Sequence, residues 1–132
     1  SDYYPGDSYV DWVGLDGYNW GNTKFGKTWE SFETIFAAGY KKVLGYNKPI
    51  MVAETASTES GGNKGEWLEE AFTKQIPSKF PLVKALVWFN INKETSWDLS
   101  SSENSKLQFK NAANSGIFSA PLRFSGSKIT SP

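Results

Sequence analysis

Three segments of the chain end in polar side chains that could take part in catalysis or binding. Each begins with an apolar, strand-like run, and the polar ends are Asp16 to Asn19, Glu54 to Ser57 and Asn90 to Asn92. The chain has no cysteine and no histidine, which excludes Ser-His and Cys-His catalysis and any zinc site built from those residues. The remaining chemistry is that of carboxylates, lysines, tyrosines and aromatic rings.

Glu54 is the most conspicuous of these groups. It follows the apolar run of KPIMVAETAS, residues 48–57. A glutamate directly after a buried strand is a candidate catalytic carboxylate. The alternatives are a surface carboxylate or an acid that caps the next helix. The residues alone leave all three open.

The elements that must position these groups alternate between strand and helix. Apolar runs predict strands at 12–16, 50–53 and 83–90. Apolar spacing predicts a helix capped by Thr28 and stopped by Gly45, a second over 67–76 closed by Pro77, and a third from Ser101 or Ser102 through Ala113.

This alternation predicts an α/β fold with a parallel sheet covered by helices. The carboxyl ends of parallel strands form the ligand face, so the three polar ends should lie together there. Three parallel strands leave unpaired edges, and a closed (β/α)8 barrel needs about 250 residues. The chain is therefore either a small open sheet or a piece of a larger fold.

Composition and charge limit the classes of binding partner that we expect. The 132 residues are 39% hydrophobic, and 14 basic residues balance 14 acidic ones. Such a chain is globular, and its even charge argues against nucleic acid or an anionic membrane as partner. No segment approaches the roughly 18 apolar residues of a membrane span. Residues 119–132 are predicted to be a tail or linker.

Three motifs, taken in order, carry a family resemblance. They are YYPGDSYVDWVGLDGYNWG at residues 3–21, KPIMVAETAS, and VKALVWFN at residues 83–90. With them the chain resembles glycoside hydrolase family 26, which contains β-mannanases and mixed-linkage β-glucanases on a retaining (β/α)8 barrel. The resemblance implies that residues 1–118 are the C-terminal part of a TIM-barrel catalytic domain, with barrel strands six to eight.

The resemblance also implies roles for single residues. Glu54 matches the nucleophile, and Tyr18 the tyrosine that hydrogen-bonds it. Trp88 resembles the platform below the sugar at the cleavage point, with a core residue as the alternative. Trp20 and Trp97 are weaker candidates for flanking subsites, where either could instead fill a loop.

Two further residues are expected near the substrate. Asp16 is assigned to loop structure or substrate contact, because an aspartate before Gly17 often bonds loop amides. Tyr4 belongs to a Pro-Gly loop expected at the cleft edge, and a plain turn is the alternative.

The implied activity is that of a secreted endo-β-glycanase, and β-1,4-mannan is the expected substrate. The alternatives are a mixed-linkage glucanase or a cellulase-like endoglucanase. No cofactor or metal is expected. The family's acid/base glutamate has no match here, so the chain alone should be inactive.

Two other classes of function compete with this reading. The first is a noncatalytic carbohydrate-binding or assembling half-barrel, whose sheet edges are covered by an N-terminal part or by self-association. The second, phosphate or nucleotide binding, is weak, because residues 14–17 read GLDG and do not form a GxGxxG fingerprint.

Overall fold

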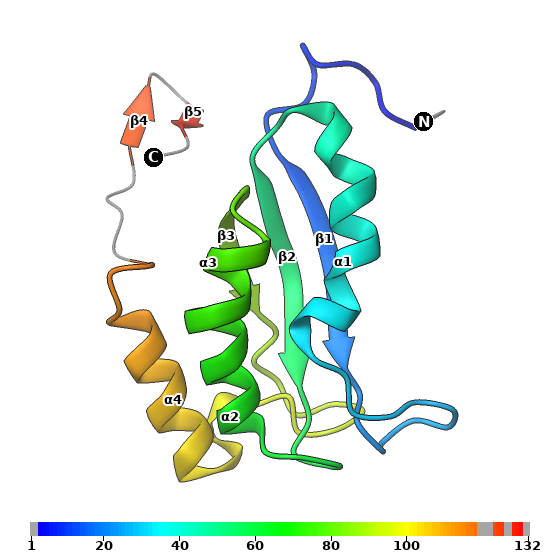
Figure 1. Cartoon of the computed structure of the whole chain (residues 1–132), viewed down its shortest axis with the longest axis vertical. Helices are drawn as coiled ribbons and strands as arrows, with labels where there is room; N and C mark the ends of the chain where they lie inside the picture. The colour runs from blue at the N-terminus through cyan, green and yellow to red at the C-terminus, as the bar shows by residue number, and fades with distance from the viewer. Residues whose placement is uncertain (1–2, 119–122, 126–127, 131–132) are drawn as a thin grey trace.

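A parallel three-stranded sheet forms the centre of the molecule (Figure 1). The computed structural model describes residues 3–118, 123–125 and 128–130. The strands are β1 (Val13–Asn19), β2 (Ile50–Ser57) and β3 (Val83–Trp88), in the order β1-β2-β3. The predicted α/β pattern is confirmed, but β1 and β2 continue past their predicted ends into the polar segments.

The first helix, α1 (Phe32–Val43), begins later than the sequence predicts. Its N-cap is Ser31, whose side chain accepts a hydrogen bond from the Thr34 amide, so the prediction of Thr28 as cap is wrong. Trp29 precedes the helix and packs against the backbone of Gly62. A 3-10 turn, η1 (Leu44–Tyr46), extends the far end, where Asn47 rather than Gly45 has the left-handed conformation.

The second helical segment contains three parts. They are α2 (Lys64–Glu69), the π-helix η2 (Glu70–Gln75) and α3 (Ile76–Lys79). Pro77 was predicted to close the helix, but it lies in the first turn of α3, where a missing N–H is tolerated. In η2, Gln75 accepts a hydrogen bond of 2.8 Å from the Glu33 amide and so links this segment to α1.

The last helix, α4 (Glu103–Ala113), follows a 3-10 turn, η3 (Leu99–Ser101). Ser102, one of the two caps that the sequence predicts, is its N-cap, and the helix packs against α2. Within the segment 119–132, β4 (Arg123–Ser125) and β5 (Lys128–Thr130) form an antiparallel pair. The rest of that segment lies outside the described residues, and its assignment as a tail or linker stays a prediction.

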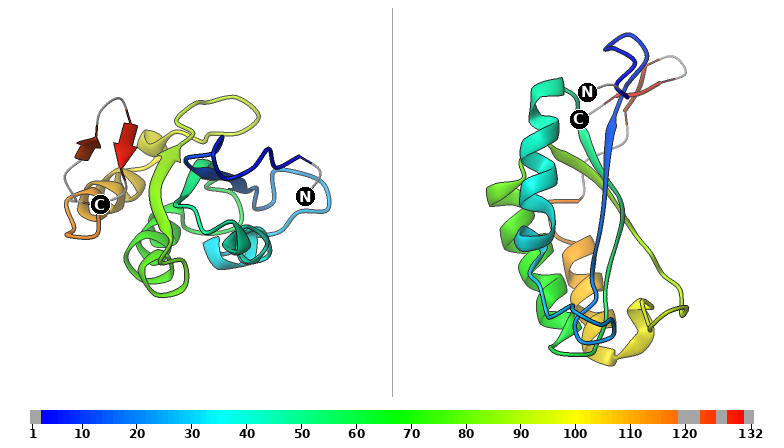
Figure 2. Two further views of the ribbon diagram at one scale, coloured as in Figure 1. Left: turned by 90° about the horizontal axis from the view of Figure 1, so that it is seen from above. Right: turned by 90° about the vertical axis from the view of Figure 1, so that its right-hand side faces the viewer.

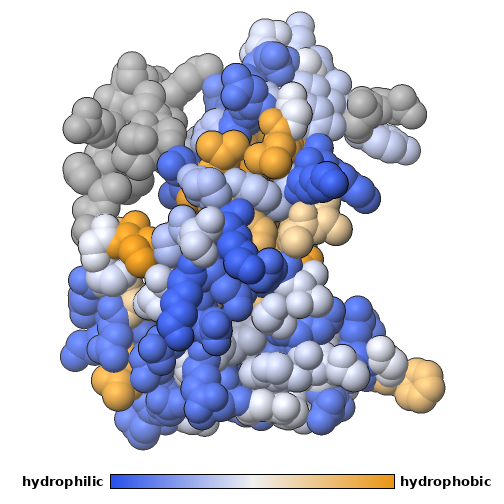
Figure 3. Space-filling model, in the orientation of Figure 1, coloured by the Kyte–Doolittle hydropathy of each residue, from blue (hydrophilic) through white to orange (hydrophobic). Residues whose placement is uncertain are grey.

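Within the part of the chain that the structure describes, the α-helices cover one face of the sheet, and no α-helix covers the other face (Figure 2). The hydrophobic core lies between this sheet and its helices; its largest members are Phe32, Phe36, Tyr40, Ile50, Val52, Trp67, Leu68, Phe72, Ile76 and Phe80. Seen from the helix side, the surface is mainly hydrophilic (Figure 3). Within the described residues, no helix is long and apolar enough to cross a membrane. We call the uncovered face the open face of the sheet.

Candidate active site

Two polar side chains of β1, Asp16 and Tyr18, lie on the open face of the sheet. Leu15 packs against the core, and a Cβ on Gly17 would lie 2.4 Å from Ile35 of α1. These two positions therefore face the helices. Successive side chains of a strand point to opposite faces, so Asp16 and Tyr18 point to the open face.

A β-bulge brings Glu54 to that same face. Leu15 pairs with Val52 and Asp16 pairs with Glu54, which leaves Ala53 as an extra residue in β2. Val52 and Thr55 are fully buried, whereas Glu54 is exposed. Plain alternation after Val52 would have turned Glu54 toward the helices. The bulge re-aims the carboxylate, as bulges often do beside active sites.

Tyr18 and Glu54 form the centre of the site. The Tyr18 hydroxyl donates a hydrogen bond to Glu54 Oε2. Burial, this hydrogen bond and the nearby charges of Glu54, Asp16 and Glu94 raise the pKa of the Tyr18 phenol above its ordinary value. The phenol therefore remains a proton donor at neutral pH. A donor in this position fixes the rotamer of the carboxylate that it bonds.

Aromatic rings surround Tyr18. The Trp97 ring lies 5.2 Å from the Tyr18 ring, Phe89 contacts it edge-on at 5.8 Å, and Trp20 is 6.1 Å away. Trp20 and Trp97 also meet edge to face at 4.8 Å. These residues come from β1, the end of β3 and the loops that follow, so the carboxyl edge of the sheet assembles them.

The two tryptophans differ in what they offer a ligand. Trp97 is 1% exposed, and its indole donates a hydrogen bond of 3.1 Å to Glu94, which holds the pKa of Glu94 below its usual range. Trp20 is half-buried, with the Lys24 ammonium 4.7 Å above its ring. Trp97 therefore supports Tyr18 from within, while Trp20 retains accessible surface.

Trp88 does not join this group. Its ring packs edge-on against Trp67 and Phe72 on the helix side of the sheet, at 6.1 and 6.3 Å. It pairs with Thr55, which is buried. The structure therefore places Trp88 in the core, which was the alternative to a platform below the sugar. Phe89, one residue later, contacts Tyr18 instead. Because Trp88 faces the helices, alternation along β3 places Phe89 on the open face.

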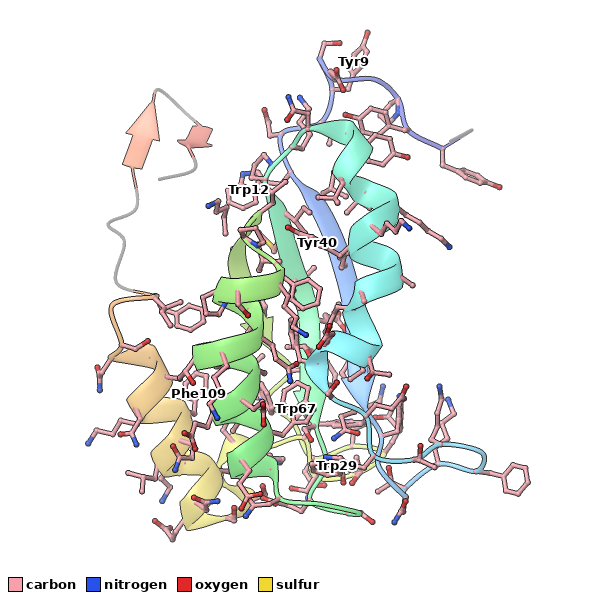
Figure 4. All side chains as sticks on the ribbon, viewed as in Figure 1. Tyr9, Trp12, Trp29, Tyr40, Trp67 and Phe109 are labelled. Carbon is pink, nitrogen blue, oxygen red and sulfur yellow. The ribbon has the colours of Figure 1, made fainter. Side chains whose placement is uncertain are left out.

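Tyr4 lies at the opposite end of the sheet. It precedes β1, and its segment lies beyond the amino-terminal ends of the strands, as the position of Tyr9 shows (Figure 4). Its ring stacks on Tyr46 at 4.1 Å, and its hydrogen bond to Asp7 raises the pKa of the phenol to about 12. The expectation of Tyr4 at the cleft edge is therefore corrected to a structural contact.

Asp16 and Glu54 are neighbouring carboxylates at the carboxyl edge, because they share a register position. In the described part of the chain, no three acidic side chains gather closely enough to hold a metal ion. The arrangement offers the Glu54 carboxylate with the Tyr18 hydroxyl as an aligned hydrogen-bond donor.

Fold and site together define an α/β protein in which the Glu54 carboxylate lies at the carboxyl ends of parallel strands. The chain belongs to glycosyl hydrolase family 26, whose sequence profile matches residues 1–115. This confirms the family resemblance seen in the three motifs.

Two relatives illustrate the family. Over 115 residues the chain is 44% identical to endoglucanase H of Acetivibrio thermocellus, covering 86% of this chain and 13% of that protein. Over 82 residues it is 37% identical to a mannan endo-1,4-beta-mannosidase of Bacillus subtilis, covering 61% of this chain and 18% of that protein. The chain thus spans less than a fifth of either relative.

Proposed function

We propose that the chain is the nucleophile-bearing part of a retaining endo-β-glycanase. The observation that carries the proposal is the hydrogen bond from Tyr18 to Glu54 at the carboxyl edge of the sheet. Glu54 attacks the anomeric carbon of a β-linked sugar and forms a covalent glycosyl-enzyme, which water then hydrolyses. The hydrogen bond from Tyr18 orients the carboxylate for that attack.

Retaining hydrolysis needs a second carboxyl group about 5 to 5.5 Å from the first, to protonate the leaving oxygen. Asp16 is a neighbour of Glu54 and lies on the same face of β1 as Tyr18. We assign it to substrate contact or to the structure of the loop after β1, and not to the acid/base role. We assign the acid/base role to a residue outside these three βα units. By this proposal the chain alone does not turn over substrate.

The open face supports the view that the sheet is part of a barrel. Its positions include the small residues Gly14, Ala53 and Ala85, and Val87, which is 49% exposed. Small and apolar side chains suit the packed interior of a (β/α)8 barrel. We propose that β1, β2 and β3 are barrel strands six, seven and eight.

The substrate is proposed to be a β-1,4-linked plant polysaccharide. The sequence favoured mannan. The relative that matches more of this chain, and at higher identity, is named an endoglucanase, which favours β-glucan. Because the other relative is named a mannanase, β-mannan is the second substrate to be tested. Polymers of this size do not cross a cell envelope intact, so we propose that the enzyme acts outside the cell.

The test uses a chimera: endoglucanase H with its matching segment replaced by that of this chain. We expect hydrolysis of β-glucan, with β-mannan and carboxymethylcellulose assayed beside it. Glu54→Gln should lower turnover by at least about 10⁴-fold, as loss of a catalytic nucleophile does. Glu54→Ala with azide should give a glycosyl azide of inverted configuration. Glu66→Gln, at an exposed helical glutamate, is the matched control.

An active Glu54→Gln chimera would overturn the nucleophile assignment. A noncatalytic role remains the second candidate, because the open face and both sheet edges need cover. Light scattering and polysaccharide binding by the 132-residue chain address it. Tight glycan binding or stable self-association, together with an inactive chimera, would favour that candidate.

A further inference from the structure

A fully buried lysine lies behind the aromatic side chains of the site. Lys64, the first residue of α2, is 0% exposed. Its ammonium donates to the backbone oxygens of Ser96 and Asp98 at 3.0 and 2.8 Å, and to the Ser101 hydroxyl at 2.8 Å. An ammonium has three protons, so all its donors are satisfied. Burial lowers the pKa of Lys64, and the charges of Glu59 and Asp98 oppose this.

The charge of Lys64 is balanced through a shared hydroxyl. Ser101 accepts from Lys64 and donates to Glu59 at 2.7 Å, and Ser105 donates to the same carboxylate oxygen at 2.8 Å. Burial alone would raise the pKa of Glu59, but the serine hydrogen bonds outweigh it and the pKa is lowered. A buried charge is expensive without such partners. Lys64 is therefore a charged group that is buried only because specific partners surround it.

The acceptors flank Trp97. Lys64 holds the carbonyls on either side of this residue, and the Trp88 indole donates to the Trp97 carbonyl itself at 2.8 Å. Three consecutive carbonyls, 96 to 98, thus have donors from the protein interior. The Trp97 ring, held in this way, packs against Tyr18.

We propose that Lys64 is a positioning residue that fixes Trp97 and, through it, the Tyr18 hydroxyl that bonds Glu54. Lys64 contacts neither Tyr18 nor Glu54, so it acts through the loop after β3. The positioning follows from the contacts alone, while its catalytic consequence rests on the proposed function.

The test is NMR of the full 132-residue chain. Lys64→Met keeps most of the side-chain volume and removes the donors. We expect loss of the nuclear Overhauser effects between Trp97 and Tyr18, and titration of the Tyr18 phenol at a lower pH, closer to the ordinary value near 10. Lys79→Met, which removes an exposed lysine paired with Glu33, is the control and should leave both signals unchanged.

A folded Lys64→Met chain with both signals unchanged would overturn the inference. Should that variant fail to fold, Ser101→Ala decides, because it removes one acceptor and the link to Glu59. It should move the same signals in the same direction by less, and unchanged signals would refute the inference.

A catalytic arm separates this inference from the proposed function. In the chimera, Lys64→Met should lower kcat as Tyr18→Phe does, and the double variant should be no slower than Tyr18→Phe. If the loss of kcat in the double variant equals the product of the two single losses, Lys64 does not act through Tyr18. If Glu54→Gln leaves the chimera active while the NMR signals respond as expected, the proposed function fails and the positioning role stands.

Discussion

Asp16 and Glu54 lie opposite each other on neighbouring parallel strands because β2 carries one extra residue, Ala53, between Val52 and Glu54. The extra residue turns the carboxylate away from the helices, to the face on which Tyr18 can reach it. The position of the glutamate in the strand is therefore as important as its presence.

Moving the carboxylate by one residue should abolish activity. In the chimera, Ala53→Glu combined with Glu54→Ala keeps the composition but moves the acid off the position paired with Asp16. We expect turnover as low as that of Glu54→Ala alone, measured as release of reducing ends. Substantial recovery of activity would show that the bulge does not set the position of the nucleophile.

Tyr18 should make the fold sensitive to alkali. Its pKa is raised in the folded state, so above about pH 10 an unfolded tyrosine loses its proton while Tyr18 keeps it. Unfolding is then favoured as pH rises, by at most about 1.4 kcal/mol per pH unit. Tyr18→Phe should flatten this loss in urea unfolding measured from pH 9 to 11.

Tyr9→Phe is the control for removal of a phenol at the other end of the sheet. Tyr4, whose pKa is also raised, is present in every variant and contributes the same background. An equal slope in Tyr18→Phe and in the parent chain would contradict the assigned hydrogen bond.

Gly17 and Gly14 should respond differently to the same substitution. A Cβ at Gly17 would lie 2.4 Å from Ile35 and 2.8 Å from Phe36, so Gly17→Ala should cost about 1 to 3 kcal/mol through overpacking. A Cβ at Gly14 would meet Ala53 at 3.5 Å, an ordinary contact. Gly14→Ala should change the free energy of unfolding by less than about 0.5 kcal/mol. Similar costs at both positions would refute the assignment of faces.

Trp88 should matter for stability rather than for sugar binding. Trp88→Phe removes the donor to the Trp97 carbonyl, and leaving that group unpaired should cost about 1 to 3 kcal/mol in urea unfolding. Oligosaccharide affinity of the chimera should change little. Trp20→Ala is the comparison, because the half-buried Trp20 ring lies beside Tyr18. It should weaken oligosaccharide binding and change the free energy of unfolding little. Weakened binding with unchanged stability in Trp88→Phe would restore the platform role.

The order of strands and helices followed from the sequence, because the apolar runs and helical spacings are strong local signals. Glu54 and Tyr18 were both expected at the carboxyl edge, and the structure joins them by a hydrogen bond. Their catalytic roles remain predictions. Tyr4 could have been excluded from the edge, since it precedes β1 and the edge lies at the far end of that strand.

Other features depend on tertiary contacts that local patterns do not contain. The face of Trp88 follows from register shifts between β2 and β3, which alternation within one strand cannot reveal. Pro77 stays within a helix because it falls in the first turn of α3, directly after a π-helix. The role of Lys64 has no local sequence signal, because its three acceptors come from residues 96–101, more than 30 positions away.

The bulge at Ala53 has a consequence for comparing related sequences. A relative with one residue fewer between Ile50 and Thr55 would keep a glutamate in the same column of an alignment if the gap were placed beside it. Whether that glutamate reaches a tyrosine would then depend on how the shorter strand pairs with its neighbour. A single-residue gap at this point therefore marks a possible change of chemistry, whereas the same gap in the surface loop after Trp20 would mark only a change of length.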